Sequence, residues 1–456
     1  MGAEQLRGLP PVHLVIQGLS GHPPSVAREA AREAVEEARR NVLSGGECPS
    51  LEDLVSLAGE KASVFSASSM TSVINATGVV LHTALGRACL PAAAVENITR
   101  VATGYAVLQW DRQAGRRGHR DSHIEELLRR ITGAQAATVA NNNAGATMLV
   151  LSALARKKEV VVSRGQLVEI GGAFRIPEVM AQSGCVMVEV GCTNRTHLRD
   201  YESALSENTG AILRVHPSNF RVRGFTGEVP LPDLVELGRK AGVPVIDDLG
   251  AGSLVPLERF GLPSEPTVQQ SIRDGASVVT CSGDKLIGGP QAGILLGEKH
   301  WIELIRKHPL ARALRVCKLT LAGLEACLKL FLEDEDYLVR HHPVYSMFAA
   351  KPSELRVRSE AFAALLAIPP SCGVSVEEMG SYIGSGALPD TAISSVGVSV
   401  ACPSPDRLAL ALRSGSPAIA VRVEEGSVKI DLRTVFPDQD EALAKRLKAE
   451  LELLWG

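Results

Sequence analysis

Short runs of β-branched residues alternate with helix-forming segments through the middle of the chain. The first of these apolar runs covers residues 73–82, and a later one covers residues 276–281. Because consecutive parallel strands need a crossover connection, alternation at this spacing predicts a mainly parallel sheet covered by helices. The other runs that predict strands are residues 135–140, 159–163, 186–190, 211–215 and 243–247.

The segment before this α/β region predicts a small helical domain. Residues 26–40 combine strong helix formers with acids and bases at helical spacing, and Pro24 and Ser25 stand where a helix would begin. A second helix is expected to begin at Ser50. This unit is either a cap on the main domain or a separate recognition module, and its composition does not choose between them.

The segment after the α/β region predicts a second small domain. Residues 301–337 favour one or two long helices, and a closing helix is expected at 440–454. Strand candidates between them are residues 392–400, 418–423 and 427–432. We therefore expect an N-terminal helical domain (1–68), an α/β large domain (69–335) and a C-terminal α+β domain (336–456).

Bulk composition restricts the class of protein. With 456 residues, 45% hydrophobic and 22% charged, the chain has the values of a soluble globular enzyme of two or three domains. A net charge of −3 gives no overall attraction to nucleic acid, so a polyanionic partner would need a local basic patch. The nine cysteines form no CxxC pair, which predicts no metal site and a reducing compartment. Without a signal pattern or a bilayer-length apolar run, we expect a cytoplasmic protein without membrane contact.

One lysine stands in a glycine-rich stretch directly after the apolar run at 276–281. The stretch reads Ser282-Gly-Asp-Lys285-Leu-Ile-Gly-Gly-Pro-Gln-Ala-Gly293. A lysine at the end of a buried strand can condense with pyridoxal phosphate (PLP), and a hydroxyl three residues before it can hold the phosphate. By itself the pattern is equally that of a turn with a solvated amine.

Two further motifs occur in the order used by fold-type I PLP enzymes. The small residues Ala144 and Gly145 follow three asparagines between a predicted strand and a predicted helix, which suits a phosphate cradle. Asp248 stands at the end of the run 243–247, where a carboxylate could keep a pyridine nitrogen protonated. Each motif alone is also an ordinary turn or helix cap. Together with Lys285 they favour PLP.

Motifs along nearly the whole chain resemble one family, the bacterial L-seryl-tRNA(Sec) selenium transferases, or selenocysteine synthases. Those motifs are Leu9-Pro-Pro11, Ile74–Thr83 with Leu85-Gly-Arg87, Asn141–Asn143, Ser163–Pro177, Thr193–His197, Arg214–Asn219, Gly224–Thr226, Ser282–Gly293 and Arg312–Arg315. The resemblance implies a fold-type I PLP-dependent transferase. It also implies that Lys285 carries the cofactor, that Asp248 faces its pyridine nitrogen, and that Ser282 with the amides near Ala144 and Gly145 holds its phosphate.

The same resemblance assigns the selenium donor to three arginines, Arg87, Arg312 and Arg315. Guanidinium forks suit a phosphate oxyanion, and Arg312 and Arg315 stand three apart, on one face if they are helical. Asp284 either assists proton movement or caps the local structure. His82 and His216 are candidate polar groups of the site, although a histidine packed in the core is the more common case.

The implied reaction converts seryl-tRNA(Sec) to selenocysteinyl-tRNA(Sec) with selenophosphate, through a PLP-bound aminoacrylyl intermediate. The family uses its N-terminal helical domain to bind the tRNA and forms a ring of dimers, such as a decamer. Three positions depart from the family pattern, since Ala84, Gln166 and Cys192 replace its usual Asn, Glu and Thr. Further departures lie in Leu108–Trp110 and Gly384–Pro389. They leave a second hypothesis open, a related PLP-dependent lyase or transferase acting on a free amino acid or an amino-sugar acid.

Overall fold

The structure is a computed structural model that describes residues 8–172, 174–366 and 369–456. Residues 1–7 of the predicted helical domain, and Ala173 within the motif Ser163–Pro177, lie outside the described residues. The chain divides into two compact units, Met1–Ser72 and Val73–Gly456, which are described separately here. No helix among the described residues combines the length and the apolar character needed to cross a bilayer.

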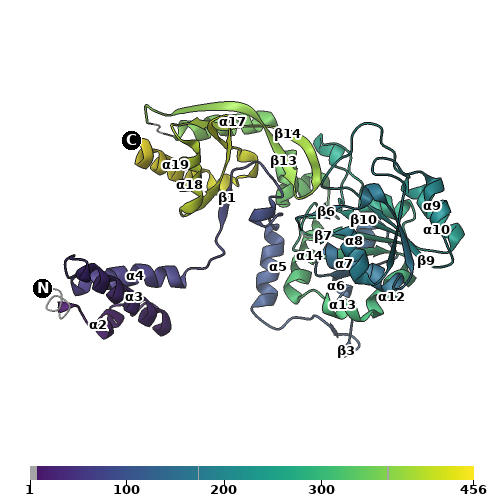
Figure 1. The fold of residues 1–456 in the computed structure, drawn as a ribbon, viewed down its shortest axis with the longest axis horizontal. Helices are drawn as coiled ribbons and strands as arrows, with labels where there is room; N and C mark the ends of the chain where they lie inside the picture. Colours follow the sequence, from purple (N-terminus) through teal and green to yellow (C-terminus); the bar gives the residue numbers. More distant parts are fainter. Residues whose placement is uncertain (1–7, 173, 367–368) are drawn as a thin grey trace. The chain divides into compact units, whose positions relative to one another are not determined.

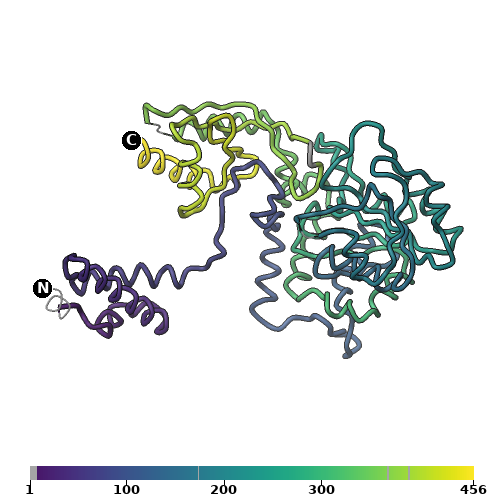
Figure 2. The backbone as a smooth tube through the Cα atoms, viewed as in Figure 1, coloured from purple at the N-terminus to yellow at the C-terminus, as the bar shows by residue number. Residues whose placement is uncertain are grey.

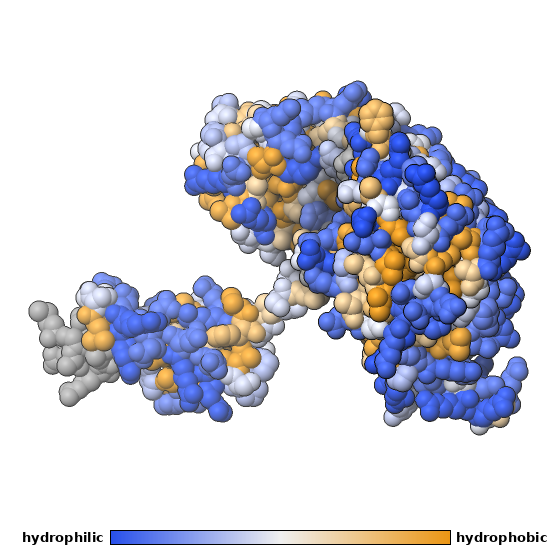
Figure 3. Space-filling view, turned by 45° about the vertical axis from the view of Figure 1, so that its right-hand side comes forward, coloured by the Kyte–Doolittle hydropathy of each residue, from blue (hydrophilic) through white to orange (hydrophobic). Residues whose placement is uncertain are grey.

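The described residues of the N-terminal unit form three helices, of which the second and third are the two that the sequence predicted. They are α2 (Val12–Gln17), α3 (Pro24–Leu43) and α4 (Leu51–Ser66). Alanines on one face of α3, such as Ala27, Ala31 and Ala34, pack with Leu54 of α4 in a small core. Ser50 and Asp53 form a reciprocal capping box that begins α4. The charged residues are left outside, and the visible face of this unit in Figure 3 is mainly hydrophilic.

The second unit is built on a seven-stranded sheet, and the predicted mainly parallel sheet is confirmed. Figure 1 shows it with helices on both sides. All neighbouring strands are parallel except at β12, which runs antiparallel to both of its neighbours. In sheet order the strands are β4 (Ala136–Ala140), β12 (Gly293–Gly297), β11 (Val278–Ser282), β10 (Val245–Gly250), β9 (Thr209–Val215), β5 (Glu159–Ser163) and β8 (Val186–Val190).

Alternate residues of these strands enter two different cores. In β9, Ile212 packs into one core and Leu213 into the other, because successive side chains of a strand point to opposite faces. The first core is covered by α6 (Ser122–Thr132), α9 (Leu198–Ala204), α10 (Leu231–Ala241), α11 (Val268–Arg273) and α14 (Lys318–Leu330). The second is covered by α7 (Asn143–Leu154), α8 (Ile176–Ser183) and α12 (Lys299–Lys307). The strands therefore end between two layers of helices, and polar groups at these strand ends can face a shared cavity.

The prediction of one or two long helices over residues 301–337 is wrong. The structure has α12, α13 (Pro309–Ala313), α14 and the start of α15 (Glu335–His341) in this region. Pro309 begins α13 because its ring fixes φ and it needs no amide partner there, whereas it would break a continuous helix. The chain then continues into α16 (Pro343–Ala349) and α17 (Pro352–Ala364).

The C-terminal residues form a four-stranded antiparallel sheet packed against helices. Its order is β13 (Gly373–Gly384), β14 (Ala387–Ala401), β17 (Ser427–Ile430) and β16 (Arg422–Glu424). The predicted strand 392–400 lies within the much longer β14, and the closing helix is confirmed as α19 (Asp440–Trp455). The predicted strand 418–423 divides into β15 (Ala418–Ala420) and β16, which belong to different sheets. The remaining helix is α18 (Pro405–Ser414).

Residues 73–82 join the C-terminal sheet region and not the seven-stranded sheet. Only Val73–Asn75 forms a strand, β1, which pairs in parallel with β15. Farther along, the amide of Val80 donates to the carbonyl of Tyr382 at 2.9 Å. Figure 2 shows this early segment running among the C-terminal residues. A boundary at residues 335/336 between a large and a C-terminal domain stays a prediction.

The smaller elements complete the second unit. They are η2 (Thr83–Leu85), α5 (Ala92–Ala102), β2 (Trp110–Asp111) with β3 (Arg116–Arg117), η3 (Arg164–Gln166), β6 (Glu169–Ile170) with β7 (Phe174–Arg175), η4 (Leu257–Phe260), η5 (Leu432–Thr434) and η6 (Pro437–Gln439).

Candidate functional site

Lys285 lies in the loop that follows β11, at the end of the strand as the sequence predicted. Its side chain is buried, with the residue only 7% exposed. Burial, and next the positive charge of Arg87, lower the pKa of its amine below the ordinary lysine value. A larger share of the amine is therefore neutral and able to act as nucleophile or base than for a solvated lysine.

Asp248 lies at the end of β10 and is held by three hydrogen bonds. Asn143 Nδ2 donates to its Oδ1 at 2.8 Å, Thr147 Oγ1 donates to its Oδ2 at 2.9 Å, and the amide of Gly250 donates to Oδ1 at 3.0 Å. Full burial raises the pKa of this carboxyl, and the hydrogen bonds oppose that shift. The carboxylate is thus fixed in place but has no directly bonded cation in the part of the chain that the structure describes, so a ligand with a protonated ring nitrogen would complete its environment.

Asn142 shapes the predicted phosphate cradle at the start of α7. Its side chain caps the helix by accepting from the amide of Gly145 at 2.8 Å. Because the first turn of a helix leaves several amides without intrahelical partners, the amides of Asn143 and Ala144 are the ones left to a phosphate. Gly145 thus belongs to the cradle through packing and capping, with its own amide already used.

These groups face one cavity of about 390 Å³. The cavity brings together the predicted residues Lys285, Asp284, Asp248, Ser282, Ala144 and Arg87. Its apolar wall comes from the short hairpin β6–β7 and its approach, through Val168, Ile170 and Phe174. These residues lie within the motif Ser163–Pro177, but no feature of the sequence indicated that they belong to the site.

Arg87 reaches the lysine loop from the turn after η2. Its Nη1 donates to Asp284 Oδ2 at 2.5 Å, next to Lys285 in the chain. Arg87 has φ of 66°, in the left-handed region, directly after Gly86. This tight turn aims the guanidinium back toward the cavity, so that one cation and one carboxylate line it as a pair.

Arg312 and Arg315 do not line this cavity. The expectation that they share one helical face is wrong, because α13 ends at Ala313 and Arg315 follows in the loop. Both side chains are exposed. They stand close enough to Arg120 for their charges to lower the pKa of its guanidinium, although burial is the larger cause. Arg120 is thus a basic residue of this cluster that sequence reasoning missed, since only tertiary placement reveals it.

His216 lines the cavity, whereas His82 does not. His216 Nε2 lies 2.9 Å from Glu265 Oε2, and Glu265 is buried. A carboxylate accepts only, so this contact fixes the ring with its proton on Nε2. His82 precedes η2, and its Nδ1 is buried without a hydrogen-bond partner among the described residues.

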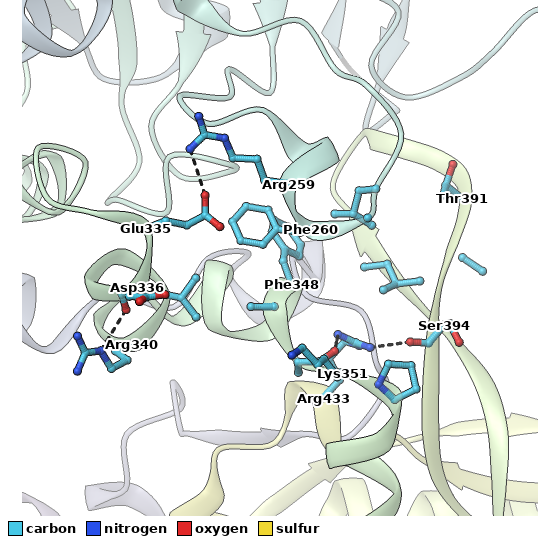
Figure 4. A pocket seen from close by; sticks show the side chains of 18 residues that line it. Arg259, Phe260, Glu335, Asp336, Arg340, Phe348, Lys351, Thr391, Ser394 and Arg433 are labelled. Carbon is cyan, nitrogen blue, oxygen red and sulfur yellow. Dashed lines mark hydrogen bonds and ion pairs between the residues drawn. The ribbon is translucent and has the colours of Figure 1, made fainter.

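A larger cavity, of about 950 Å³, lies elsewhere in the second unit (Figure 4). Its charged groups are largely engaged by the protein itself. Arg259 pairs with Glu335 at 3.1 Å, and Arg433 donates to the carbonyls of Met347, Ala350 and Ser394. The smaller cavity is therefore the candidate active site, because there the polar groups converge on a buried amine.

Comparison with known proteins decides the family. The pattern that defines the family described as L-seryl-tRNA selenium transferase matches residues 73–436. The chain belongs to this family. The L-seryl-tRNA(Sec) selenium transferase of Carboxydothermus hydrogenoformans is 44% identical over 98% of each chain. The protein of that name from Moorella thermoacetica is 47% identical over 84% of this chain and 83% of its own.

A solved structure supports the fold alone. D-Glucosaminate-6-phosphate ammonia-lyase superposes with a TM-score of 0.59 at 21% identity, covering 84% of this chain and 96% of that one. The predicted α/β class with a fold-type I large domain is confirmed. The cofactor of the L-seryl-tRNA selenium transferases is PLP.

The residues present fit PLP. Besides the lysine with its lowered pKa and the buried acid, two buried polar atoms at the cavity, Asn143 Oδ1 and Ser218 Oγ, have no hydrogen-bond partner among the described residues. Gly250 has φ of +65°, and a Cβ there would lie 3.0 Å from Ser218 Oγ. Backbone and small side chains thus leave room where a flat ring would lie.

The departures from the family pattern leave these groups in place. Gln166 is buried, and its Oε1 accepts from the amide of Val215 at 3.1 Å, a bond that the family's usual glutamate could also accept. Ala84 and Cys192 are exposed and do not line the cavity. The three changes therefore spare Lys285, Asp248 and Arg87.

Proposed function

We propose that this chain is an L-seryl-tRNA(Sec) selenium transferase, which replaces the seryl hydroxyl by selenium taken from selenophosphate. The observation that carries the proposal is the buried amine of Lys285 facing the same cavity as the buried carboxylate of Asp248, in a chain of this family. PLP, when bound, supplies an electron sink for negative charge at the seryl Cα. We assign Lys285, Asp248, Ser282, Ala144 and Gly145 to holding it.

The chain's own groups account for the proton movements. The amine of Lys285, with its lowered pKa, accepts the Cα proton. The protonated Lys285 can then pass that proton to the hydroxyl, which leaves Cβ as water, while His216, whose Nε2–H is held by Glu265, offers its unprotonated Nδ1 as an acceptor at the cavity wall. Asp284, fixed by Arg87, holds a negative charge beside the amine and steadies the protonated lysine once it forms.

Selenophosphate is assigned to Arg87 with the exposed Arg312 and Arg315 and the partly buried Arg120 near them. Guanidinium groups donate paired hydrogen bonds to phosphate oxygens. Only part of the Arg87 fork is used by Asp284, so donors remain for an anion.

Replacing Arg87 by alanine is expected to raise the KM for selenophosphate by about 10- to 100-fold, the effect of losing charge-assisted hydrogen bonds. The positive charge of Arg87 lowers the pKa of Lys285, so its removal also moves the acidic limb of the pH–rate profile, where the base becomes protonated, to higher pH. Arg259→Ala, which removes an exposed ion pair with Glu335, is the control and should change neither value. An unchanged KM in Arg87→Ala would remove this residue from the donor site.

The N-terminal unit is assigned to tRNA binding. Arg28, Arg32 and Arg39 are exposed on α3 and fall within about 40° of one another around the helix axis. The acids Glu29, Glu33 and Glu36 lie on the neighbouring face, and of these Glu36 pairs with Arg39 at 3.2 Å at the border of the two faces. This separation gives a chain of net charge −3 a local basic stripe for phosphates.

Reversing this stripe, with Arg28→Glu, Arg32→Glu and Arg39→Glu together, is expected to weaken binding of seryl-tRNA(Sec) by about 100-fold or more. The slope of log affinity against log salt should fall by about two to three units, because each lost phosphate contact removes about 0.7 to 0.9. Filter binding at several salt concentrations measures both. Arg129→Glu with Arg130→Glu, on the exposed face of α6, is the control, with two reversed charges against three. Equal binding by both variants would contradict the assignment.

The homo-oligomer, a ring of dimers such as a decamer, remains a proposal, as does the cytoplasmic location. Exposed apolar side chains at Tyr105, Val107 and Trp110 support a subunit contact, since a hydrophobic patch of this kind is rarely left in water. Sedimentation of the purified protein measures the assembly.

The function itself is tested by incubating the purified protein with PLP, selenophosphate and either seryl-tRNA(Sec) or bulk seryl-tRNA. Selenocysteinyl-tRNA should form only from the first. Turnover of a free amino acid or amino-sugar acid, without reaction on either tRNA, would support the related lyase or transferase instead.

A further inference from the structure

The loop that carries Lys285 is held from its buried side by three side chains that do not line the cavity. Tyr345 Oη donates to the carbonyl of Leu286 at 3.0 Å. His342 Nε2 and Cys327 Sγ both contact the carbonyl of Ile287, at 3.0 Å and 3.1 Å. The first two residues after the lysine are therefore fixed through their backbone.

All three contacts are made by fully buried groups. Tyr345, His342 and Cys327 are each 0% exposed. A carbonyl accepts only, so His342 must carry its proton on Nε2, and burial lowers the pKa of its ring to about 4. The imidazole is neutral at physiological pH and remains a donor there. The contact is permanent and does not switch with pH near neutrality.

A glycine in the loop allows the backbone to approach the ring of His342 closely. Gly288 has φ of +67°, and a Cβ at this position would collide with the ring of His342. Its amide donates to the carbonyl of Lys285 at 2.9 Å, which closes a turn on the lysine itself. The glycine therefore serves the contact with His342 as well as the turn.

Neighbouring aromatic rings hold the hydrogen-bond donors Tyr345 and His342 in place. The ring of Tyr345 meets Phe331 and Phe348 edge-on, with centroid distances of 5.6 Å and 5.9 Å, and lies 4.9 Å from the ring of His342. Figure 4 shows Phe348 and Phe260 on the wall of the larger cavity. That cavity is therefore bounded by the side chains that support the donors.

We propose that Tyr345 and His342, with Cys327, are positioning residues that set where the amine of Lys285 stands in the cavity. The proposal rests on the proposed function, because it concerns the amine that reacts. A buried carbonyl that loses its donor is costly, and a loop relieves that cost by moving. Displacing a reacting group by about 1 Å can cost about 100-fold in rate.

The test compares two tyrosine-to-phenylalanine variants of the full-length protein. Tyr345→Phe keeps the ring and removes one hydroxyl, and Tyr201→Phe does the same at a buried tyrosine hydrogen-bonded to the backbone of Ser163, outside the cavity lining. Both should melt at similarly lowered temperatures. Only Tyr345→Phe should slow the covalent attachment of added PLP to the apoprotein, by about tenfold, and shift the pH midpoint of the bound-cofactor absorbance. Its kcat should fall by a similar factor at an unchanged KM for seryl-tRNA(Sec).

A second pair keeps the proposal testable if Tyr345→Phe does not fold. His342→Gln retains an amide donor for the carbonyl of Ile287, whereas His342→Leu has none. Partial recovery of the attachment rate and of the absorbance midpoint in His342→Gln supports positioning. Identical values in Tyr345→Phe and Tyr201→Phe, or in the two His342 variants, would overturn it. A wild-type protein without cofactor absorbance would instead overturn the proposed function.

Discussion

Replacing Lys285 by alanine is expected to lower kcat by about 10⁴-fold or more, because the variant loses both the covalent anchor and the general base. The absorbance of cofactor attached through the lysine should disappear, and borohydride should no longer fix PLP to the protein. The measurement is single-turnover conversion of seryl-tRNA(Sec), together with the absorbance spectrum after excess PLP. Stability should change little, since a buried amine with a lowered pKa contributes no favourable charge to the fold.

Lys429→Ala is the matched control for this variant. Lys429 is also buried, at 6% exposure, but its Nζ is used by Glu377 and Ser399 in the C-terminal sheet. Its loss should lower the melting temperature and leave the absorbance intact. Turnover in Lys285→Ala at the wild-type rate would be incompatible with the proposed mechanism.

Asp248→Asn is expected to lower kcat by about 10² to 10³-fold, the range found when one preorganised electrostatic partner is removed. The amide can keep the hydrogen bonds from Asn143 and Gly250 on its oxygen, so the site should hold its shape. What it loses is the negative charge that keeps the ring nitrogen of PLP protonated. Steady-state kinetics and the cofactor spectrum report the two effects separately.

Asp247→Asn, one residue earlier, should lower the stability of the protein and leave kcat nearly unchanged. Asp247 is also fully buried, but it pairs with Arg214 at 2.7 Å and does not line the cavity. Leaving Arg214 without its partner should cost about 3 to 5 kcal/mol of unfolding free energy, with little effect on kcat. If the two variants lost kcat equally, Asp248 would not be the specific partner of the cofactor.

The sequence predicted the strands of the large sheet well because those strands are buried on both faces. A strand such as β5 then appears as a continuous run of valines that needs no knowledge of its neighbours. β12 was missed because its residues directly follow the lysine stretch, where the glycines had already been interpreted as a loop. The early part of the β13–β14 hairpin was missed because only one of its faces is covered, and Glu377 and Glu378 break its apolar pattern.

A site residue could be predicted from the sequence where its residue type and its place at the end of a strand together indicate its chemical role. Lys285 and Asp248 satisfy that condition, and the structure brings them to one cavity. Thr147, which donates to Asp248 across 101 positions of sequence, has no local signature. The same is true of Arg120 and of the donors behind the lysine loop, whose importance depends only on which helices pack there.

The pairing of residues 73–82 with the C-terminal sheet sets an order for synthesis of the chain. Gly78 donates to Thr434, a partner 356 residues later. At ribosomal speeds of about 5 to 20 residues per second, the earlier segment emerges roughly 20 to 70 s before its partner exists. Ile74 and Ala76 are buried in a core whose other members are Phe362 and later residues, so for most of that interval they lack these partners. The nascent chain therefore exposes a short apolar segment that is a natural place for a chaperone to bind.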